Sequence, residues 1–423
     1  MTAPTRVCPP LIDGDRLTRA EFERRYDAMP ELKKAELIDG VVHMPSPVSF
    51  DRHASPHAHI VTWLGVYLSQ TPGVRLGDNG TVRLTDDTEV QPDGLLLIFP
   101  GGQATIDSDD YILGSPEFVA EVAASSASVD RHAKLRAYQR AGVREYLLWR
   151  VDADVIDWLV LRNGTFQPLS AGVDGVLRSE AFPGLWLDAA ALRRGDLAAV
   201  LAMLQRGLAT PEHGACPAFA RPERRRAAAM TAPTRVCPPL VNGDRLSRAE
   251  FERRYDAMPE LKKAELIDGV VHMPSPVSFS RHSSPHAALI GWLITYQAHT
   301  PGVSVGDNGT VRLTEDTEVQ PDGLLLIHSG GQATIDADDF VSGAPELVAE
   351  VAASSASVDR HAKLRAYQHA GVREYLLWRV DADVIDWLVL RGGAFQPLTA
   401  GPDGVLRSEA FPGLWLDPAT ACD

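Results

Sequence analysis

The sequence contains the same domain-sized segment twice. The segment that starts at Met1 returns at Met230 with the identical string MTAPTRVCPPL, and an offset of 229 residues then aligns both copies without a gap. Of the 194 aligned positions, 35 differ. Solenoid repeats have periods of about 20 to 50 residues, so a period of this length indicates duplication of a whole domain. A copy of about 190 residues is long enough to bury its own hydrophobic core.

The duplication predicts three parts: a first domain at 1–194, a connecting segment at 195–229 and a second domain at 230–423. The connecting segment opens with GDLAAVLAMLQRGLA, whose apolar residues have helical spacing, and we expect a helix that ends the first domain. The remainder, TPEHGACPAFARPERRRAAA, has the Pro-, Ala- and Arg-rich composition of a linker. The second copy has no counterpart of this helix, so we expect it to lack one packing element.

Composition excludes several classes of protein. The formal net charge is −15, which argues against general coating of nucleic acid or membrane but allows a local basic cleft. The chain has 4 cysteines and no C-x-x-C pair, so a disulfide framework or cysteine-rich zinc site is not expected. The N-terminus lacks the apolar core of a secretory signal, and no apolar run approaches the roughly 20 residues that span a bilayer. We therefore expect a soluble, cytoplasmic protein with no membrane partner.

The order of elements within one copy predicts a mixed α/β fold. The pattern indicates a mixed central β-sheet flanked by helices, followed by a β-rich C-terminal part. The predicted elements are a helix opening at Thr18, a hairpin at 36–44 turning at Asp39-Gly40, a helix at 55–70, strands within 73–84 on either side of 77–80, buried strands at 90–98 and 118–123, a helix at 128–141 that stops at Gly142, and strands at 145–150 and 155–161.

Two acidic residues lie in apolar strands. Glu121 interrupts FVAEVAA, and Asp93 begins the apolar run of QPDGLLLI. A buried carboxylate costs several kcal/mol, roughly, unless it is paired or binds a metal. Two carboxylates on adjacent strands are suitable ligands for a hard cation such as Mg²⁺. Two alternatives stay open: Glu121 is satisfied by a backbone or Arg partner, and Asp93 belongs only to a Pro-Asp-Gly turn.

The helix after the Glu121 strand carries a second polar pattern. Asp130, Lys134 and Tyr138 follow one another at intervals of four residues and share one helical face. A lysine near the end of the Glu121 strand could stabilise negative charge on a phosphate. The alternative is an Asp–Lys pair on an exposed face, which contributes a few tenths of a kcal/mol, roughly.

Taken together, these motifs resemble the Uma-two family of restriction-endonuclease-like proteins, part of the PD-(D/E)xK nuclease superfamily. The resemblance covers nearly all of each copy. The matching residues are Pro92-Asp93, Glu121-Val122, Asp130, Lys134, Tyr138, Gly142-Val143 and Glu145-Tyr146, with E-L-I-D-G at Glu36 to Gly40 and His57 further upstream.

This resemblance implies a restriction-endonuclease-like core and a Mg²⁺-dependent endonuclease that hydrolyses DNA, in which Mn²⁺ can substitute. Asp93, Glu121 and the carbonyl of Val122 are then the implied metal ligands, and Lys134 the implied catalytic lysine. In the wider superfamily the lysine follows the acid by two residues, where this chain has Ala123. The implied auxiliary residues are Glu36, His57, Asp130 and Tyr138.

The second copy keeps every member of this set. The implied catalytic residues there are Asp322, Glu350 and Lys363, with Val351 as a metal ligand, and the auxiliary residues are Glu265, His286, Asp359 and Tyr367. Two complete sites in one chain suggest an intramolecular pseudo-dimer. The alternative functions are a non-catalytic nucleic-acid-binding or protein-interaction module, and a scaffold in which the acids are structural.

Two further motifs have weaker interpretations. His53 and His57 have the i, i+4 spacing of zinc ligands, but no third ligand lies at suitable spacing, so we expect capping, surface or supporting roles. Arg221 and the run at 224–226 are most simply part of a solvated linker, and contact with the DNA backbone is the alternative.

Overall fold

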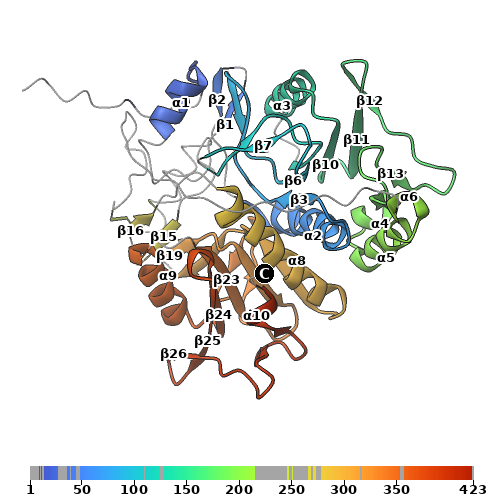
Figure 1. Cartoon of the computed structure of the whole chain (residues 1–423). Helices are drawn as coiled ribbons and strands as arrows, with labels where there is room; N and C mark the ends of the chain where they lie inside the picture. Colours follow the sequence, from blue (N-terminus) through green and yellow to red (C-terminus); the bar gives the residue numbers. More distant parts are fainter. Residues whose placement is uncertain are drawn as a thin grey trace, which may run out of the picture.

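Figure 1 shows the computed structural model of the chain. The structure describes residues 9, 11, 14–26, 36–38, 40–43, 48–108, 110–123, 128–214, 245–246, 250, 265–267, 270–272, 278–314, 317–352 and 357–421. We call the part before Met230 the first half and the part from Met230 the second half. The basic run of the linker lies outside the described residues.

The first half is a mixed α/β fold. Its helices are α1 (Arg19–Tyr26), the π-helix η1 (Phe50–Ala54), α2 (Ser55–Ser69), α3 (Ser128–Ala141), α4 (Ala189–Arg193), α5 (Leu197–Leu208) and α6 (Pro211–Gly214). Its strands are β1 (Glu36–Ile38), β2 (Val41–His43), β3 (Val74–Gly77), β4 (Val82–Thr85), β5 (Thr88–Val90), β6 (Gly94–Ile98), β7 (Thr105–Ile106), β8 (Ile112–Leu113), β9 (Phe118–Ala123), β10 (Glu145–Arg150), β11 (Val155–Arg162), β12 (Thr165–Pro168), β13 (Leu177–Arg178) and β14 (Trp186–Leu187).

The second half repeats this order. Its helices are the π-helix η2 (Phe279–Ser283), α8 (Ser284–Ala298), α9 (Ser357–Ala370), the 3₁₀ turn η3 (Val380–Ala382) and α10 (Pro418–Ala421). Its strands are β15 (Glu265–Ile267), β16 (Val270–His272), β17 (Val303–Asp307), β18 (Val311–Thr314), β19 (Thr317–Val319), β20 (Gly323–Ile327), β21 (Thr334–Ile335), β22 (Val341–Ser342), β23 (Leu347–Ala352), β24 (Glu374–Arg379), β25 (Val384–Arg391), β26 (Ala394–Pro397), β27 (Leu406–Arg407) and β28 (Trp415–Leu416).

The central sheet of the first half runs in the order β3-β6-β9-β10-β11-β12. Strands β9 and β10 are parallel, whereas β6 and β9 are antiparallel. Parallel neighbours require a crossover connection, and α3 is that connection. The first half also has a second sheet, in the order β2-β1-β5-β4-β8-β7. The second half has the same two sheets. The predicted mixed α/β fold, present twice, is therefore confirmed.

The two faces of the central sheet are covered by different helices. Side chains alternate between faces along a strand, so Phe118 and Ala120 of β9 pack in the core with α2, whereas Val119 packs in the core with α3. In β6, Leu96 belongs to the α2 face, and Leu95 and Leu97 belong to the α3 face. Pro56 lies in the first turn of α2, where a proline is favoured. Gly142 ends α3 with a φ of 89°, a left-handed conformation that glycine adopts readily.

Several predicted elements have the expected limits. The hairpin at 36–44 pairs as β1 and β2, and the helix at 128–141 is α3. The helix at 55–70 is α2, preceded by the unpredicted π-helix η1. The run at 90–98 is not one strand, because Gln91-Pro92-Asp93 separates β5 from β6. Proline has no N–H for a sheet ladder, which explains the interruption.

Helix α5 covers a surface of the first half whose equivalent in the second half is exposed. It packs against α2 and β14 so closely that a Cβ on Gly207 would lie 2.7 Å from the Trp186 ring. The residue aligned with Trp186 is Trp415, whose side chain is 57% exposed. Trp415 borders an open groove of about 420 Å³ that is also lined by Trp292 and Trp378.

The two halves contact each other through equivalent elements. Helices α2 and α8 pack side by side (Figure 1). The N–H of Phe50 donates to the carbonyl of Asp339 over 2.7 Å, and the N–H of Phe279 donates to the carbonyl of Asp110 over 2.8 Å. Each of these phenylalanine rings is buried in the core of the opposite half. A Cβ on Gly306 would lie 2.7 Å from the Phe50 ring, so this close approach requires glycine there.

None of the helices in the described ranges is both long enough and apolar enough to span a lipid bilayer.

We predict that α5 stabilises the first half. Leu204 is fully buried on this helix, so Leu204→Ala should lower the free energy of unfolding by about 2–5 kcal/mol, measured by denaturant titration. The exposed neighbour Gln205 is a matched control on the same helix, and Gln205→Ala should change the free energy of unfolding by less than about 0.5 kcal/mol. Equal unfolding midpoints for the two variants would contradict the prediction.

Candidate active site

The sheet register places the two predicted acids opposite each other. Strands β6 and β9 pair antiparallel, with Gly94 opposite Ala120, so one residue further along Asp93 faces Glu121. The Glu121 side chain lies on the face covered by α3, because Glu121 alternates with Val119 along β9, whereas Asp93 lies in the bend just before β6. Directly opposed residues of an antiparallel pair have Cβ atoms about 4.5–5.5 Å apart. Residues that are 28 positions apart in the chain therefore form one acidic pair.

Glu121 is held by two side chains of α3. The Nζ of Lys134 donates to Oε1 of Glu121 over 2.9 Å, and the hydroxyl of Tyr138 donates to the same oxygen over 2.7 Å. Lys134 is 5% exposed and Glu121 is 6% exposed, so this is a buried ion pair. The crossover from β9 to β10 carries α3 back over the sheet, which explains how a lysine 13 residues away reaches the carboxylate. The exposed-pair interpretation of Lys134 is wrong.

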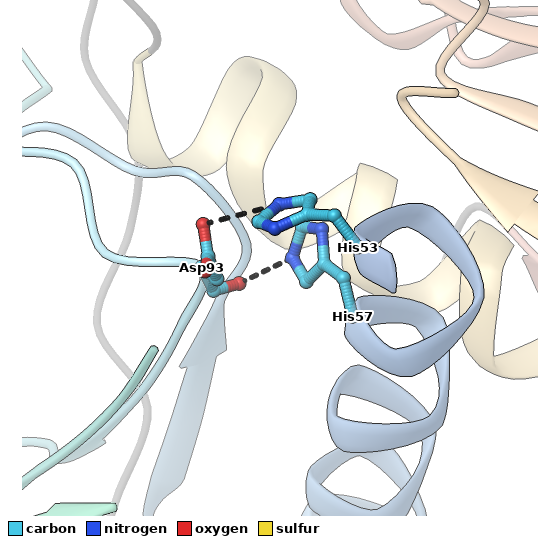
Figure 2. A group of neighbouring side chains, drawn as sticks. All are labelled: His53, His57 and Asp93. Carbon is cyan, nitrogen blue, oxygen red and sulfur yellow. Dashed lines mark hydrogen bonds and ion pairs between the residues drawn. The ribbon is translucent and has the colours of Figure 1, made fainter. Parts of the chain in front are cut away.

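Asp93 is positioned by its own strand neighbour and by α2. Its Oδ2 accepts a hydrogen bond of 2.8 Å from the N–H of Val122, and its backbone carbonyl is 2.7 Å from Nε2 of His57. Nε2 of His53 lies 3.9 Å from Oδ1 of Asp93 (Figure 2). Asp93 is 5% exposed and bonded through its carboxylate to the next strand, so it is more than part of an exposed turn.

The second half reproduces this geometry. Lys363 and Tyr367 donate to Oε1 of Glu350 over 2.9 and 2.7 Å. The N–H of Val351 donates to Oδ2 of Asp322 over 2.8 Å. Nε2 of His286 is 2.8 Å from the carbonyl of Asp322.

The remaining predicted residues are described only by their backbones. Glu36 and Glu265 begin strands β1 and β15, and Asp130 and Asp359 lie in the first turn of helices α3 and α9. Their side chains lie outside the described part of the structure. The structure therefore brings together Asp93, Glu121, Lys134, Tyr138 and His57 in the first half and their counterparts in the second.

The structure also groups His53, His57 and Asp93, whose potential ligand atoms all lie within 4.8 Å of one another. A third potential ligand therefore lies beside the two histidines in space, although none lies at suitable spacing in the sequence. Sequence spacing could not reveal this group, because the sheet register brings Asp93 to the helix from 36 residues beyond His57.

Sequence reasoning missed two buried acids beside His57. Asp78 follows β3 in the first half, and Asp307 ends β17 in the second; both have no exposed surface. Oδ1 of Asp78 is 3.1 Å from Nε2 of His57, and Oδ2 of Asp307 is 3.5 Å from Nδ1. Burial alone would lower the pKa of His57, but the carboxylates of Asp307, Asp78 and Asp93 outweigh it and raise the pKa to about 10. The pKa of His286 is raised to about 10 by the equivalent groups.

Two other buried acids, Glu145 and Glu117, have purely structural surroundings. Glu145 begins β10 and accepts hydrogen bonds from the Trp158 indole, the Ser179 hydroxyl and the N–H groups of Glu180 and Ala181. Glu117 accepts from the N–H groups of Ile98 and Gln103. Backbone and neutral donors dominate these sites, whereas Glu121 is bonded to a cationic lysine and faces a second carboxylate.

The acidic pair fits a hard divalent cation. Asp93 and Glu121 offer carboxylate oxygens, the ligand type that Mg²⁺ and Mn²⁺ take, and Mg²⁺ sites commonly use one or two carboxylates. Hydrogen bonds from Val122, Lys134 and Tyr138 fix the orientation of both carboxylates. The chemistry of the donor set therefore agrees with the predicted ligands.

No curated protein matches the chain. A solved structure described as "a putative nuclease" from Anabaena variabilis is similar at 14% sequence identity and a TM-score of 0.31, covering 38% of this chain and 89% of that one. The model of the Uma2 family, described as "Putative restriction endonuclease", matches residues 19–190 and again residues 248–419. These two segments make up more than half of the sequence, and the chain therefore belongs to the Uma2 family.

Proposed function

We propose that the chain is a Mg²⁺-dependent endonuclease that hydrolyses phosphodiester bonds in DNA. The observation that carries this proposal is the opposed carboxylates of Asp93 and Glu121 with the buried ammonium of Lys134 bonded to one of them. Membership of a family described as "Putative restriction endonuclease" supports the same reaction class. The negative net charge agrees with a site that needs a bound cation before it accepts a polyanion.

Asp93 and Glu121 would hold the metal ion, with the Val122 carbonyl as a further oxygen ligand. When bound, Mg²⁺ supplies Lewis-acid activation of water and neutralises phosphate charge. Lys134 would stabilise the negative charge that develops on the phosphate, because its ammonium group is buried where electrostatic interactions are strong. Tyr138 fixes the rotamer of Glu121 through their hydrogen bond.

His57 acts in this proposal as a positioning residue. Its ring bonds the backbone carbonyl of Asp93 from the α2 side of the sheet, and so holds the strand end that carries the carboxylate. Glu36 and Asp130 remain auxiliary candidates from the family resemblance. His286, Glu265 and Asp359 have the same proposed roles in the second half.

We further propose that the units at 1–194 and 230–423 act as an intramolecular pair. Reciprocal contacts support this: Asp339 accepts from the N–H groups of Asp51 and Arg52, and Asp110 accepts from the N–H of Ser280. Two sites held by one chain could cleave both strands of a duplex in a single binding event.

We predict that the acids are required for cleavage. Asp93→Ala combined with Asp322→Ala should lower the rate of Mg²⁺-dependent plasmid nicking by about 10²-fold or more, the scale on which lost electrostatic stabilisation lowers kcat. The matched control is Asp157→Ala with Asp386→Ala, which removes two acids on β11 and β25 that pair with Arg150 and Arg379 of the neighbouring strands. Undiminished nicking by the first variant would contradict the proposal.

A DNA-binding module would behave differently in the same assay. It would bind duplex DNA without cutting it, and binding would be insensitive to Lys134→Ala with Lys363→Ala. Such a result with the intact wild-type chain would replace the nuclease by the alternative.

We also predict that the two sites share double-strand cleavage. Wild-type protein should convert plasmid to the linear form, whereas Asp93→Ala alone and Asp322→Ala alone should each accumulate the nicked circle. Gel quantification of the two forms tests this, with light scattering to verify that one chain acts alone. If either single variant linearises plasmid as fast as the wild type, the halves do not act as a pair.

A further inference from the structure

Four buried side chains meet where α2 and α8 pack together. His57 and Asp78 come from the first half, and His286 and Asp307 come from the second. The histidines are 1% exposed and the aspartates have no exposed surface. We call these four residues the interhalf cluster. Each half contributes one imidazole and one carboxylate, so the cluster is symmetric and occurs once in the chain.

The hydrogen bonds of the imidazoles define which nitrogens face the centre of the cluster. Nε2 of His57 is 2.7 Å from the carbonyl of Asp93, and Nε2 of His286 is 2.8 Å from the carbonyl of Asp322. A carbonyl oxygen can only accept a hydrogen bond, so both Nε2 atoms carry a proton. The raised pKa of both histidines puts a proton on Nδ1 as well in the metal-free cluster, so a metal ion would displace that proton and use the Nδ1 lone pair, which points toward the opposite half.

These Nδ1 atoms face carboxylate oxygens at distances that suit no direct hydrogen bond. Nδ1 of His57 is 3.5 Å from Oδ2 of Asp307, and Nδ1 of His286 is 3.6 Å from Oδ2 of Asp78. N–H···O hydrogen bonds have lengths of about 2.7–3.2 Å. Nδ1 of His57 and the Oδ2 atoms of Asp78 and Asp307 are buried and have no hydrogen-bond partner among the described residues. Buried polar atoms are nearly always satisfied by protein, ordered water or an ion, so these three atoms point to a bound group at this position.

We propose that the interhalf cluster binds one transition-metal ion of the Zn²⁺ class, with the two Nδ1 and two Oδ2 atoms as its ligands. With bonds of about 2.0–2.1 Å, neighbouring ligand atoms of a tetrahedral zinc site lie about 3.4 Å apart. The two Nδ1–Oδ2 separations are close to this length. Potential ligand atoms of three of the four residues, His57, Asp78 and Asp307, all lie within 4.8 Å of one another, and His286 would complete the set as the fourth ligand.

Charge and supporting contacts agree with this assignment. A divalent ion that displaces one proton from each imidazole balances the charge of the two aspartates, so no net charge is buried. Metal-binding histidines usually donate their second ring N–H to a carbonyl or carboxylate, as both histidines do here. Because two ligands come from each half, the ion would join the halves. This role does not rest on DNA cleavage.

Two rival arrangements predict different numbers of bound ions. The group of His53, His57 and Asp93 has a counterpart in the second half, where Nε2 of His282 is 3.5 Å from Oδ2 of Asp322. Binding there would give two ions per chain. If protons on Nδ1 occupy the cluster instead, no ion binds. The interhalf cluster gives one ion per chain.

The test uses the intact chain, stripped with a chelator and dialysed against Zn²⁺ without Mg²⁺. Metal analysis should give one Zn²⁺ per chain, and Zn²⁺ should raise the thermal unfolding temperature. Asp93→Ala with Asp322→Ala should keep that ion, because the backbone carbonyls that orient the histidines remain. Asp78→Asn with Asp307→Asn should weaken Zn²⁺ binding by at least about 10²-fold, since two of four ligands are changed.

Asp51→Ser is the matched control. It removes another carboxylate from the same interface, and its counterpart in the second half is already Ser280. This variant should keep one Zn²⁺ with unchanged affinity. If the double Asn variant does not fold by circular dichroism, Asp307→Asn alone takes its place and should weaken binding at least tenfold.

Zero or two ions in the wild type, or unchanged Zn²⁺ affinity in the Asn variants, would overturn the proposal. Because the readout is metal content, the result is independent of whether the chain cleaves DNA.

Discussion

The buried ion pair between Glu121 and Lys134 ties the crossover helix α3 to the centre of the sheet. Breaking a buried pair by removing one partner costs about 3–5 kcal/mol, because the remaining charge is left unpaired in a low-dielectric interior. Exposed pairs such as Arg150–Asp157 contribute at most about 1 kcal/mol. The pair therefore fixes α3 over the sheet face that carries Glu121. A site of this kind exists only when sheet and helix are both in place.

Sequence reasoning identified Glu121 because an acid in an apolar strand is unusual, and it identified Asp93 because an acid begins a buried run. Their mutual position depends on the β6–β9 register, which no local pattern contains. Lys134 was selected through the family motif, since helical spacing alone also fitted an exposed face. The buried acid Glu145 was noted only as a motif residue, because its satisfying donors come from 13 to 36 residues away.

Asp78 was missed for a different reason. Gly-Asp-Asn-Gly is a turn sequence, and a turn usually leaves its polar side chains in water. Here the opposite half covers the turn, so the carboxylate is fully buried beside His57. Burial of this kind depends on packing between segments that are more than 200 residues apart in the chain. A single copy, considered alone, contains no signal for it.

The differences between the copies are unevenly distributed, and this bears on how the halves pair. Of the 35 differing positions, 11 lie in 51–70 and its counterpart 280–299, the stretch that forms the interhalf contacts. In contrast, 121–130 and 141–160 are identical to their counterparts. Two separate identical domains must use one self-complementary surface, whereas halves within one chain can change each side independently. One asymmetry of this kind involves aligned positions: Asp51 contacts Asp339 on one side of the interface, whereas Ser280 contacts Asp110 on the other.

Helix α2 connects this interface to the acidic pair. The two nitrogens of the His57 ring point in different directions, one to the carbonyl of Asp93 and one to Asp307 of the opposite half. Rotation of the ring to improve one contact would lengthen the other. The positions of Asp93 and Asp322 therefore depend on how α2 packs against α8. Separation of the halves would remove the second contact of each histidine and leave two buried aspartates exposed to water. Any function of the acidic pair should accordingly be evaluated in the complete chain.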